Sequence, residues 1–220
     1  MAREIRVLSA GAVKPGLTKL SQEFEREHSV SLQVEFATAP AIAKRIAGNE
    51  TFDIVIAPLA LLASTQSTLL GRIGVGVMVR DGAALPNIAR AKQLTQSLLD
   101  SASIMFNQAS TGLYIDNLLK RLAIAVQVEA RITRCGDFAA VRDLIAASHD
   151  NAIGFGATTV IAESAGQGVT YAGPLPAELQ NYTSYAAALT ASTTAGEAKA
   201  FIDYLATPAA RSILKSAGID

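Results

Sequence analysis

Several residue types and patterns are scarce in this sequence, and each scarcity argues against a class of protein. Cys135 is the one cysteine, so no intramolecular disulfide can form and we expect a free thiol. The 19 Lys and Arg residues balance 19 Asp and Glu residues, with no run of like charge. This balance argues against a nucleic-acid partner. No apolar run approaches the roughly 20 residues that cross a bilayer, so we expect no membrane insertion.

The N-terminal stretch MAREIRVLSAGAV lacks the apolar core of a secretory signal. Three charged residues, Arg3, Glu4 and Arg6, stand before its short apolar run. We therefore expect a cytoplasmic protein from the sequence as written, or a periplasmic one if a leader has been removed.

Motifs for common cofactors and nucleophiles are also missing. There is no P-loop, no GxGxxG after a strand, no HExxH, no CxxC and no GxSxG. The two histidines, His28 and His149, fall near predicted helix ends, where a dipole partner is a commoner role than a general base. We expect no cofactor and no metal.

What the sequence does contain is a regular alternation of short apolar runs with helical patterns. This alternation is typical of βαβ units, which build mainly parallel sheets with helices on both faces. With 220 residues, half of them hydrophobic, the chain can bury a sizeable core. We predict an α/β fold with strands at 5–9, 31–36, 53–57, 75–80, 103–106, 130–133, 152–155 and 186–189, helices at 14–28, 42–46, 59–70, 112–122 and 138–147, and two last helices separated by Pro208.

The chain changes character at Asp81-Gly82, with Pro86 close behind, and this change predicts a first crossing between two lobes. The alternation then repeats, and the turn-rich piece GPLPAELQNYTSY precedes a strand that we expect to return to the first lobe. We assign residues 1–80 and 186–220 to lobe 1 and residues 81–185 to lobe 2.

Three turns stand where a predicted strand meets a following helix: Ser9-Ala10-Gly11-Ala12, Thr38-Ala39-Pro40 and Ser110-Thr111-Gly112. In open parallel sheets, ligands sit beyond the carboxyl ends of the strands. Small residues there let a ligand approach the backbone, and the free amides of a helix N-terminus favour an anion. The alternative is that Ser and Thr are N-caps and that Gly supplies permitted backbone geometry. Because the turns occupy equivalent positions, we predict a site for a small oxyanion or carboxylate.

Two tyrosines, Tyr182 and Tyr185, lie between the Pro-rich turn and an apolar strand. A phenol at this place can reach across a cleft and donate a hydrogen bond to a ligand. Tyr185 as a core residue is an equally good interpretation of the pattern.

The same turns lie within segments by which the chain resembles the type II periplasmic solute-binding proteins, in the branch that contains the molybdate-binding proteins. The segments span nearly the whole chain: VLSAGAVKPGL, VEFATAPAIAKRI, FDIVIAP, STGLYIDNLLKRLAI, GPLPAELQNYTSYAAAL and FIDYLATPAARSILKSAGI. The resemblance implies a two-lobed fold that closes on a small anionic ligand in a cleft between the lobes. It also implies an ABC permease as partner if the protein is exported.

The resemblance does not carry the substrate over. Molybdate binders present a serine in the first turn and another in the second, and the aligned positions here are Ala12 and Ala39. Pro58, after the third strand, removes a backbone amide donor. Tyr185 resembles the family's ligand tyrosine, although Tyr182 fits that alignment too. We therefore predict weak or no molybdate binding and an organic carboxylate as ligand.

Two kinds of function remain open. The first is a binding protein, either a transport receptor or a ligand sensor, and it is the one we favour. The second is a cofactor-independent isomerase of the aconitate isomerase type, which would shift a proton along a di- or tricarboxylic acid. Tyr182, Tyr185, Lys14 and Lys44 are the candidate bases near the predicted site, although both lysines fit ordinary solvated helix positions.

Overall fold

The computed structural model describes residues 3–63, 65–149, 151–191, 193 and 196–220. The chain divides into two compact units, the first comprising Met1–Ile73 and Thr183–Asp220 and the second Gly74–Tyr182. The chain therefore crosses between the units at residues 73–74 and 182–183, a few residues before the crossings predicted from sequence. No helix in the described part of the chain is both long enough and apolar enough to traverse a bilayer.

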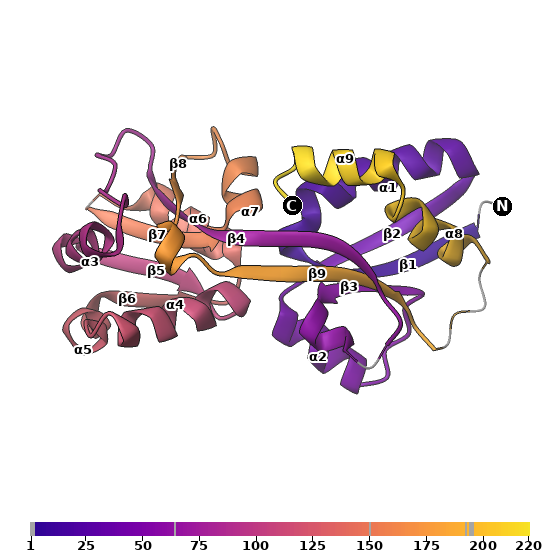
Figure 1. Cartoon of the computed structure of the whole chain (residues 1–220), viewed down its shortest axis with the longest axis horizontal. Coiled ribbons are helices and arrows are strands. Elements are labelled where there is room, and N and C mark those ends of the chain that lie inside the picture. The colour runs from indigo at the N-terminus through magenta and orange to yellow at the C-terminus, as the bar shows by residue number, and fades with distance from the viewer. Residues whose placement is uncertain (1–2, 64, 150, 192, 194–195) are drawn as a thin grey trace. The chain divides into compact units, whose positions relative to one another are not determined.

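The first unit is built on a sheet of order β2 (Val30–Ala37), β1 (Arg3–Ala10), β3 (Ile54–Pro58), β9 (Tyr182–Leu189). The first three strands run parallel, and β9 is antiparallel to β3. Figure 1 shows α1 (Lys14–His28), α8 (Gly196–Leu205) and α9 (Pro208–Ser216) on one face and α2 (Ala39–Ala47) on the other.

The core of this unit follows from the apolar spacing of α1. Leu17, Leu20 and Phe24 recur on one helix face and are each at most 1% exposed. The Phe24 ring lies 4.9 Å from the ring of Phe201 in α8, measured between centroids. The long N-terminal helix and the C-terminal helices thus share one apolar layer above the sheet.

The second unit has a sheet of order β8 (Val169–Pro174), β4 (Thr68–Arg80), β7 (Ala152–Ala157), β5 (Ser103–Asn107), β6 (Ile132–Cys135). The last three of these run parallel, and β4 is antiparallel to both of its neighbours in this unit. Figure 1 shows α3 (Ala91–Asp100), α4 (Ser110–Arg121) and α5 (Ala125–Val128) on one face and α6 (Phe138–Ala147) and α7 (Thr158–Glu163) on the other. Apolar side chains of the first set form one buried cluster and those of the second set another.

The two units repeat one strand plan. In each, the first strand, β1 or β5, lies between the second and third, and an antiparallel strand extends the sheet beside the third. Each parallel strand is followed by a turn and a helical segment, so the carboxyl ends of the strands gather at one sheet edge in each unit.

One predicted element is wrong. The apolar run at 59–70 is not a helix but a short 3₁₀ turn, Leu59–Leu62, followed by β4 from Thr68; residue 64 lies outside the described residues. The physical reason is tertiary: the residues from Thr68 onward pair with neighbouring strands as part of β4.

Candidate functional site

The candidate residues of the first unit meet at the edge where β1, β2 and β3 end. The register pairs Ala10 with Ala37 and, on the other side, Ala57 with Ala186. Pro58 pairs with Tyr185, one step further toward the edge. Ser9–Ala12, Thr38–Pro40, Pro58 and Tyr185 are therefore brought together, as expected for the carboxyl ends of parallel strands.

Hydroxyl groups play a smaller part at this edge than the sequence suggests. Ser9 is fully buried, and its hydroxyl donates to the Ala10 carbonyl at 3.3 Å. Thr38 occupies the N-cap of α2, but its side chain makes no capping hydrogen bond. Neither side chain therefore caps a helix through a hydrogen bond, contrary to the N-cap interpretation of the sequence.

Backbone groups at the helix starts are the donors that this edge offers. The first hydrogen bond of α2 runs from the Ile42 amide to the Thr38 carbonyl at 2.9 Å. The backbone amides that precede Ile42 in the first turn therefore have no acceptor within the helix. Pro40 contributes no N–H to that turn. A β-carbon at Gly11 would meet nothing within 4 Å, so the backbone there faces open space. These features suit an anion approaching the backbone.

Tyr185 is the most unusual side chain at this edge. The residue is 6% exposed, and its hydroxyl makes no hydrogen bond to another described residue, although that oxygen is not among the fully buried atoms that lack a partner. Burial raises the pKa of this phenol to about 12, so the hydroxyl keeps its proton at neutral pH. It is a protonated donor in register with the last residue of β3.

Sequence reasoning missed one neighbour of the site, Phe36. Its ring is 37% exposed at the end of β2 and is paired in register with Ser9. The Lys14 ammonium lies 5.9 Å from the centre of this ring, which places a cation at the start of α1 beside an aromatic surface. The signal in the sequence was an apolar residue at the last outward-facing position of a strand.

The second unit has an equivalent edge, where β5, β6 and β7 end. Ser110 and Thr111 are the first two residues of α4, whose N-cap is Ala109, so neither is a cap. Gly112 follows, and a β-carbon there would lie 1.5 Å from the Asn107 carbonyl oxygen. Glycine is needed for this close approach of helix and strand end, and not for a left-handed backbone, since Gly112 has no positive φ.

Tyr182 belongs to this second unit and is 51% exposed. Its ring edge comes within 3.3 Å of the place that a β-carbon on Gly74 would occupy. Beside it, the Gln180 side chain accepts from the Val75 amide at 2.8 Å and donates to the Val75 carbonyl at 3.0 Å. Tyr182 and Tyr185 thus lie in different units and in different surroundings.

The histidines and the cysteine lie away from both edges or are buried. His28 closes α1, stacks on Phe24 at 4.0 Å between ring centroids and contacts the Phe24 carbonyl through Nδ1. Cys135 is 6% exposed at the end of β6, and burial raises the pKa of its thiol. Within the part of the chain that is described, no three His, Cys, Asp or Glu side chains are grouped to hold a metal ion.

Residues 5–220 match the model of the bacterial extracellular solute-binding proteins. The chain belongs to that family. The match covers the elements of both units, including the two sheet edges described above.

Three relatives of this solute-binding protein illustrate its range. An aconitate isomerase from Pseudomonas sp. is 26% identical over 233 residues, which cover 98% of this chain and 87% of the relative. The periplasmic molybdate-binding protein of Azotobacter vinelandii superposes with a TM-score of 0.78 at 17% identity, covering 98% of each chain. PEB3 with bound L-phospholactate superposes with a TM-score of 0.73 at 15% identity, covering 97% of this chain and 98% of its own. The two structural relatives share the type II periplasmic-binding-protein fold.

Proposed function

We propose that this solute-binding protein binds a small organic carboxylate at the sheet edge of its first unit. The observation that carries the proposal is Tyr185: a largely buried, protonated phenol whose hydroxyl makes no hydrogen bond to another described residue, in register with Pro58 where three parallel strands end. A carboxylate oxygen would accept a hydrogen bond from this hydroxyl. Hydrogen bonds to a charged group are worth about 1.5–3 kcal/mol each.

The surroundings of Tyr185 favour an anion bound mainly by backbone groups. The helices that follow β1 and β2 begin at this edge, and a helix N-terminus carries partial positive charge. Their first turns contain small residues, so a ligand oxygen can reach the amides. Lys14, beside Phe36 at the same edge, is placed to attract a ligand with a second negative group.

An organic acid suits this edge better than molybdate does. Ala12 and Ala39 offer methyl groups where molybdate binders are expected to offer hydroxyls, and Pro58 offers no amide. The Ser9 hydroxyl is buried and already bonded. An oxyanion with four polar oxygens would therefore leave lone pairs unpaired, at about 1–3 kcal/mol each, whereas a carbon skeleton can pack on the alanines and the proline. One relative above is an aconitate isomerase, and another, PEB3, has L-phospholactate bound; both compounds are organic acids.

The direct test is a thermal-shift and calorimetric screen of the wild-type protein against molybdate, tungstate, sulfate, phosphate and a set of di- and tricarboxylates. A ligand that binds only the folded state stabilises it and so raises its melting temperature. At a free ligand concentration of 100 times Kd, the stabilisation is about 2.7 kcal/mol. We expect a shift with at least one carboxylate and none with molybdate. A molybdate shift would overturn our interpretation of Ala12 and Ala39.

The role of Tyr185 is tested by Tyr185→Phe, with Tyr182→Phe as the matched control. Loss of the Tyr185 hydroxyl should weaken carboxylate binding about 10- to 100-fold, the value of one hydrogen bond to a charged group. It should leave the melting temperature of the ligand-free protein unchanged or slightly higher, because the hydroxyl has no partner to lose. A destabilised free protein with unchanged affinity would show that the phenol is a structural residue.

Isomerisation of a small di- or tricarboxylic acid is the second candidate function, favoured by the aconitate isomerase relative. Tyr185 is a poor base for this reaction, because its raised pKa keeps it protonated at neutral pH. Lys14, at the start of α1, is the basic side chain at the same edge. Incubation with cis- and trans-aconitate, followed by proton NMR, separates the two functions: interconversion above the uncatalysed rate, lost in Lys14→Met, would favour the enzyme.

A further inference from the structure

Lys14 is the first residue of α1 and stands where a helix disfavours a positive charge. The first turn of α1 contains no acidic residue, whereas Arg26 and His28 lie in its last turn, where cations are favourable. The Lys14 side chain is exposed, and its ammonium forms no ion pair with another residue in the described part of the chain. A local rule that is broken without compensation inside the protein points to a partner outside it.

The Lys14 ammonium lies beside an aromatic ring, 5.9 Å from the centre of Phe36. Phe36 is the penultimate residue of β2 and is 37% exposed. Val30 and Leu32, at alternate positions of the same strand, are buried, so Phe36 continues their sheet face to the edge where the strands end. An exposed ring at this place can pack against the carbon chain of a ligand while it keeps the ammonium close by.

The backbone between the strands of Phe36 and Tyr185 is open. In the sheet order β2-β1-β3-β9, these two residues belong to the outer strands and flank β1 and β3. Gly11 follows β1, and a β-carbon there would meet nothing within 4 Å. A ligand that extends from Tyr185 toward Lys14 would pass this open stretch of backbone.

The strand positions also set the length of such a ligand. The strands β2 and β9 are three steps apart in the sheet, and with about 4.8 Å between neighbours their backbones are separated by about 14 Å. The side chains of Tyr185 and Lys14 are long, and the lysine stem is flexible, so each can shorten this distance from its own side. Two carboxylates on one carbon are too close together to reach both groups, whereas a chain of several carbons suits the gap.

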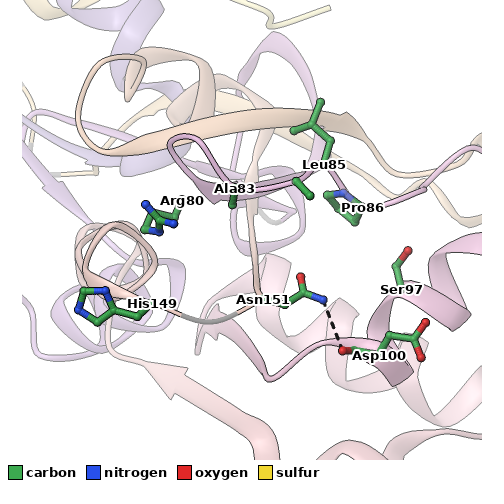
Figure 2. Close-up of a pocket in the computed structure, with 9 residues that line it drawn as sticks. Arg80, Ala83, Leu85, Pro86, Ser97, Asp100, His149 and Asn151 are labelled. Atoms are coloured by element: carbon green, nitrogen blue, oxygen red, sulfur yellow. Dashed lines mark hydrogen bonds between the residues drawn. The ribbon is translucent and has the colours of Figure 1, made fainter.

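The arginines of the second unit are placed differently. Arg134 is the penultimate residue of β6, and its guanidinium binds Asp116 at 2.7 Å and Glu129 at 2.9 Å. Arg80 lines the pocket of about 380 Å³ shown in Figure 2, near the amino end of β7 and not at the carboxyl edge of the sheet. Neither arginine is therefore as available to an anion at a carboxyl edge as Lys14 is.

We propose that Lys14 and Phe36 make the site of the first unit selective for α,ω-dicarboxylates with two or more methylene groups between the carboxylates. The first carboxylate accepts a hydrogen bond from Tyr185, as in the proposed function on which this inference rests. The second accepts a hydrogen bond from the Lys14 ammonium, and the methylene chain packs on the Phe36 ring. The bound ligand thereby compensates the positive charge at the start of α1.

The experiment is a calorimetric titration of the full chain with malonate, succinate, glutarate and adipate. Each is paired with the monocarboxylate of equal carbon number: propionate, butyrate, pentanoate and hexanoate. At least one dicarboxylate from succinate to adipate should bind about tenfold more tightly than its partner, the effect of one hydrogen bond between charged groups. Malonate should show no such preference.

Three variants assign this preference to the charge of Lys14. Lys14→Met keeps a side chain beside Phe36 but removes the charge, so the preference should fall below about threefold while monocarboxylate binding stays unchanged. Lys14→Arg should retain most of the preference. Lys19→Met, which removes an exposed charge from the same helix, is the matched control and should bind as wild type does.

Failure of this inference and failure of the proposed function give different results. If no carboxylate binds, both are overturned. If mono- and dicarboxylates bind equally and Tyr185→Phe weakens both, the carboxylate site stands and its selectivity through Lys14 is overturned. The same conclusion follows if Lys14→Met keeps the preference, or if Lys19→Met loses it to the same extent.

The melting temperature of the ligand-free protein separates binding from a structural role. Lys14→Met should not lower it, because the variant removes a charge that opposes the helix dipole. A lower melting temperature, together with an equal loss of affinity for both classes of ligand, would make Lys14 a structural residue and overturn the proposal.

Discussion

Gly112→Ala is expected to destabilise the second unit, because a β-carbon at this position has no room. It would stand 1.5 Å from the Asn107 carbonyl oxygen and 2.7 Å from the carbonyl carbon. Carbon and oxygen in contact normally keep about 3.3 Å, so α4 and the end of β5 would have to separate by about 2 Å. Overpacking of this kind costs about 1–3 kcal/mol, and more where backbone must move. Alanine recovers about 1 kcal/mol of helix propensity.

We therefore expect a net loss of about 2 kcal/mol or more in the free energy of unfolding, measured by urea denaturation followed by circular dichroism. The matched control is Gly136→Ala at the same sheet edge, because a β-carbon there would meet nothing within 4 Å. The control should stay within about 0.5 kcal/mol of wild type. Equal midpoints for the two variants would refute the steric argument and the assignment of Gly112 as a close-approach glycine.

Three further predictions concern the ion pairs of Arg45, the thiol of Cys135 and the hydrogen bonds between the Gln180 side chain and the Val75 backbone. Hydrogen bonds from Arg45 lower the pKa of the Glu35 and Glu50 carboxyls; their stabilisation is full above the unfolded value of about 4.3 and is lost as pH falls through the lower folded pKa. Arg45→Gln should therefore flatten the fall in melting temperature between about pH 5 and pH 3, and an unchanged profile would count against the ion pairs. Since burial raises the pKa of Cys135, iodoacetamide at pH 8 should alkylate it slowly in the native protein and rapidly in urea, as mass spectrometry would show; rapid native labelling would contradict the buried position. Gln180→Met keeps the size of the side chain but removes its two hydrogen bonds to the Val75 backbone. It should lower the free energy of unfolding in urea by about 1–3 kcal/mol; a loss below about 0.5 kcal/mol would mean that water replaces these hydrogen bonds.

Much of the fold could be predicted because its signals are local. The helices at 14–28 and 138–147 have the bounds predicted from the sequence, since their apolar spacing sets one buried face. The helix predicted at 59–70 was wrong because a short apolar run does not distinguish a strand from a helix. Pairing with neighbouring strands makes the residues from Thr68 onward part of β4. The α3 helix, Ala91–Asp100, was missed in the segment after Pro86, although Leu94 and Leu98 have helical spacing.

The positions of the candidate residues in the fold could be predicted from the sequence, whereas their hydrogen bonds could not. Parallel strands place Ser9, Thr38 and Pro58 at one edge, and the alternation of strands and helices is enough to infer this. The burial of the Ser9 hydroxyl and the missing partner of Tyr185 depend on contacts between segments far apart in the sequence.

The order of the units along the chain has a consequence for biosynthesis. The second unit is one continuous segment, Gly74–Tyr182, whereas the first needs Thr183–Asp220 to complete it. A chain emerging from the ribosome can therefore complete the second unit before the first. Until β9 and Phe201 are synthesised, β3 lacks its antiparallel neighbour and Phe24 lacks the ring that packs on it. Until translation ends, the strands of the first unit have an unpaired edge and an uncovered apolar layer, which is the state in which a chaperone would meet this protein.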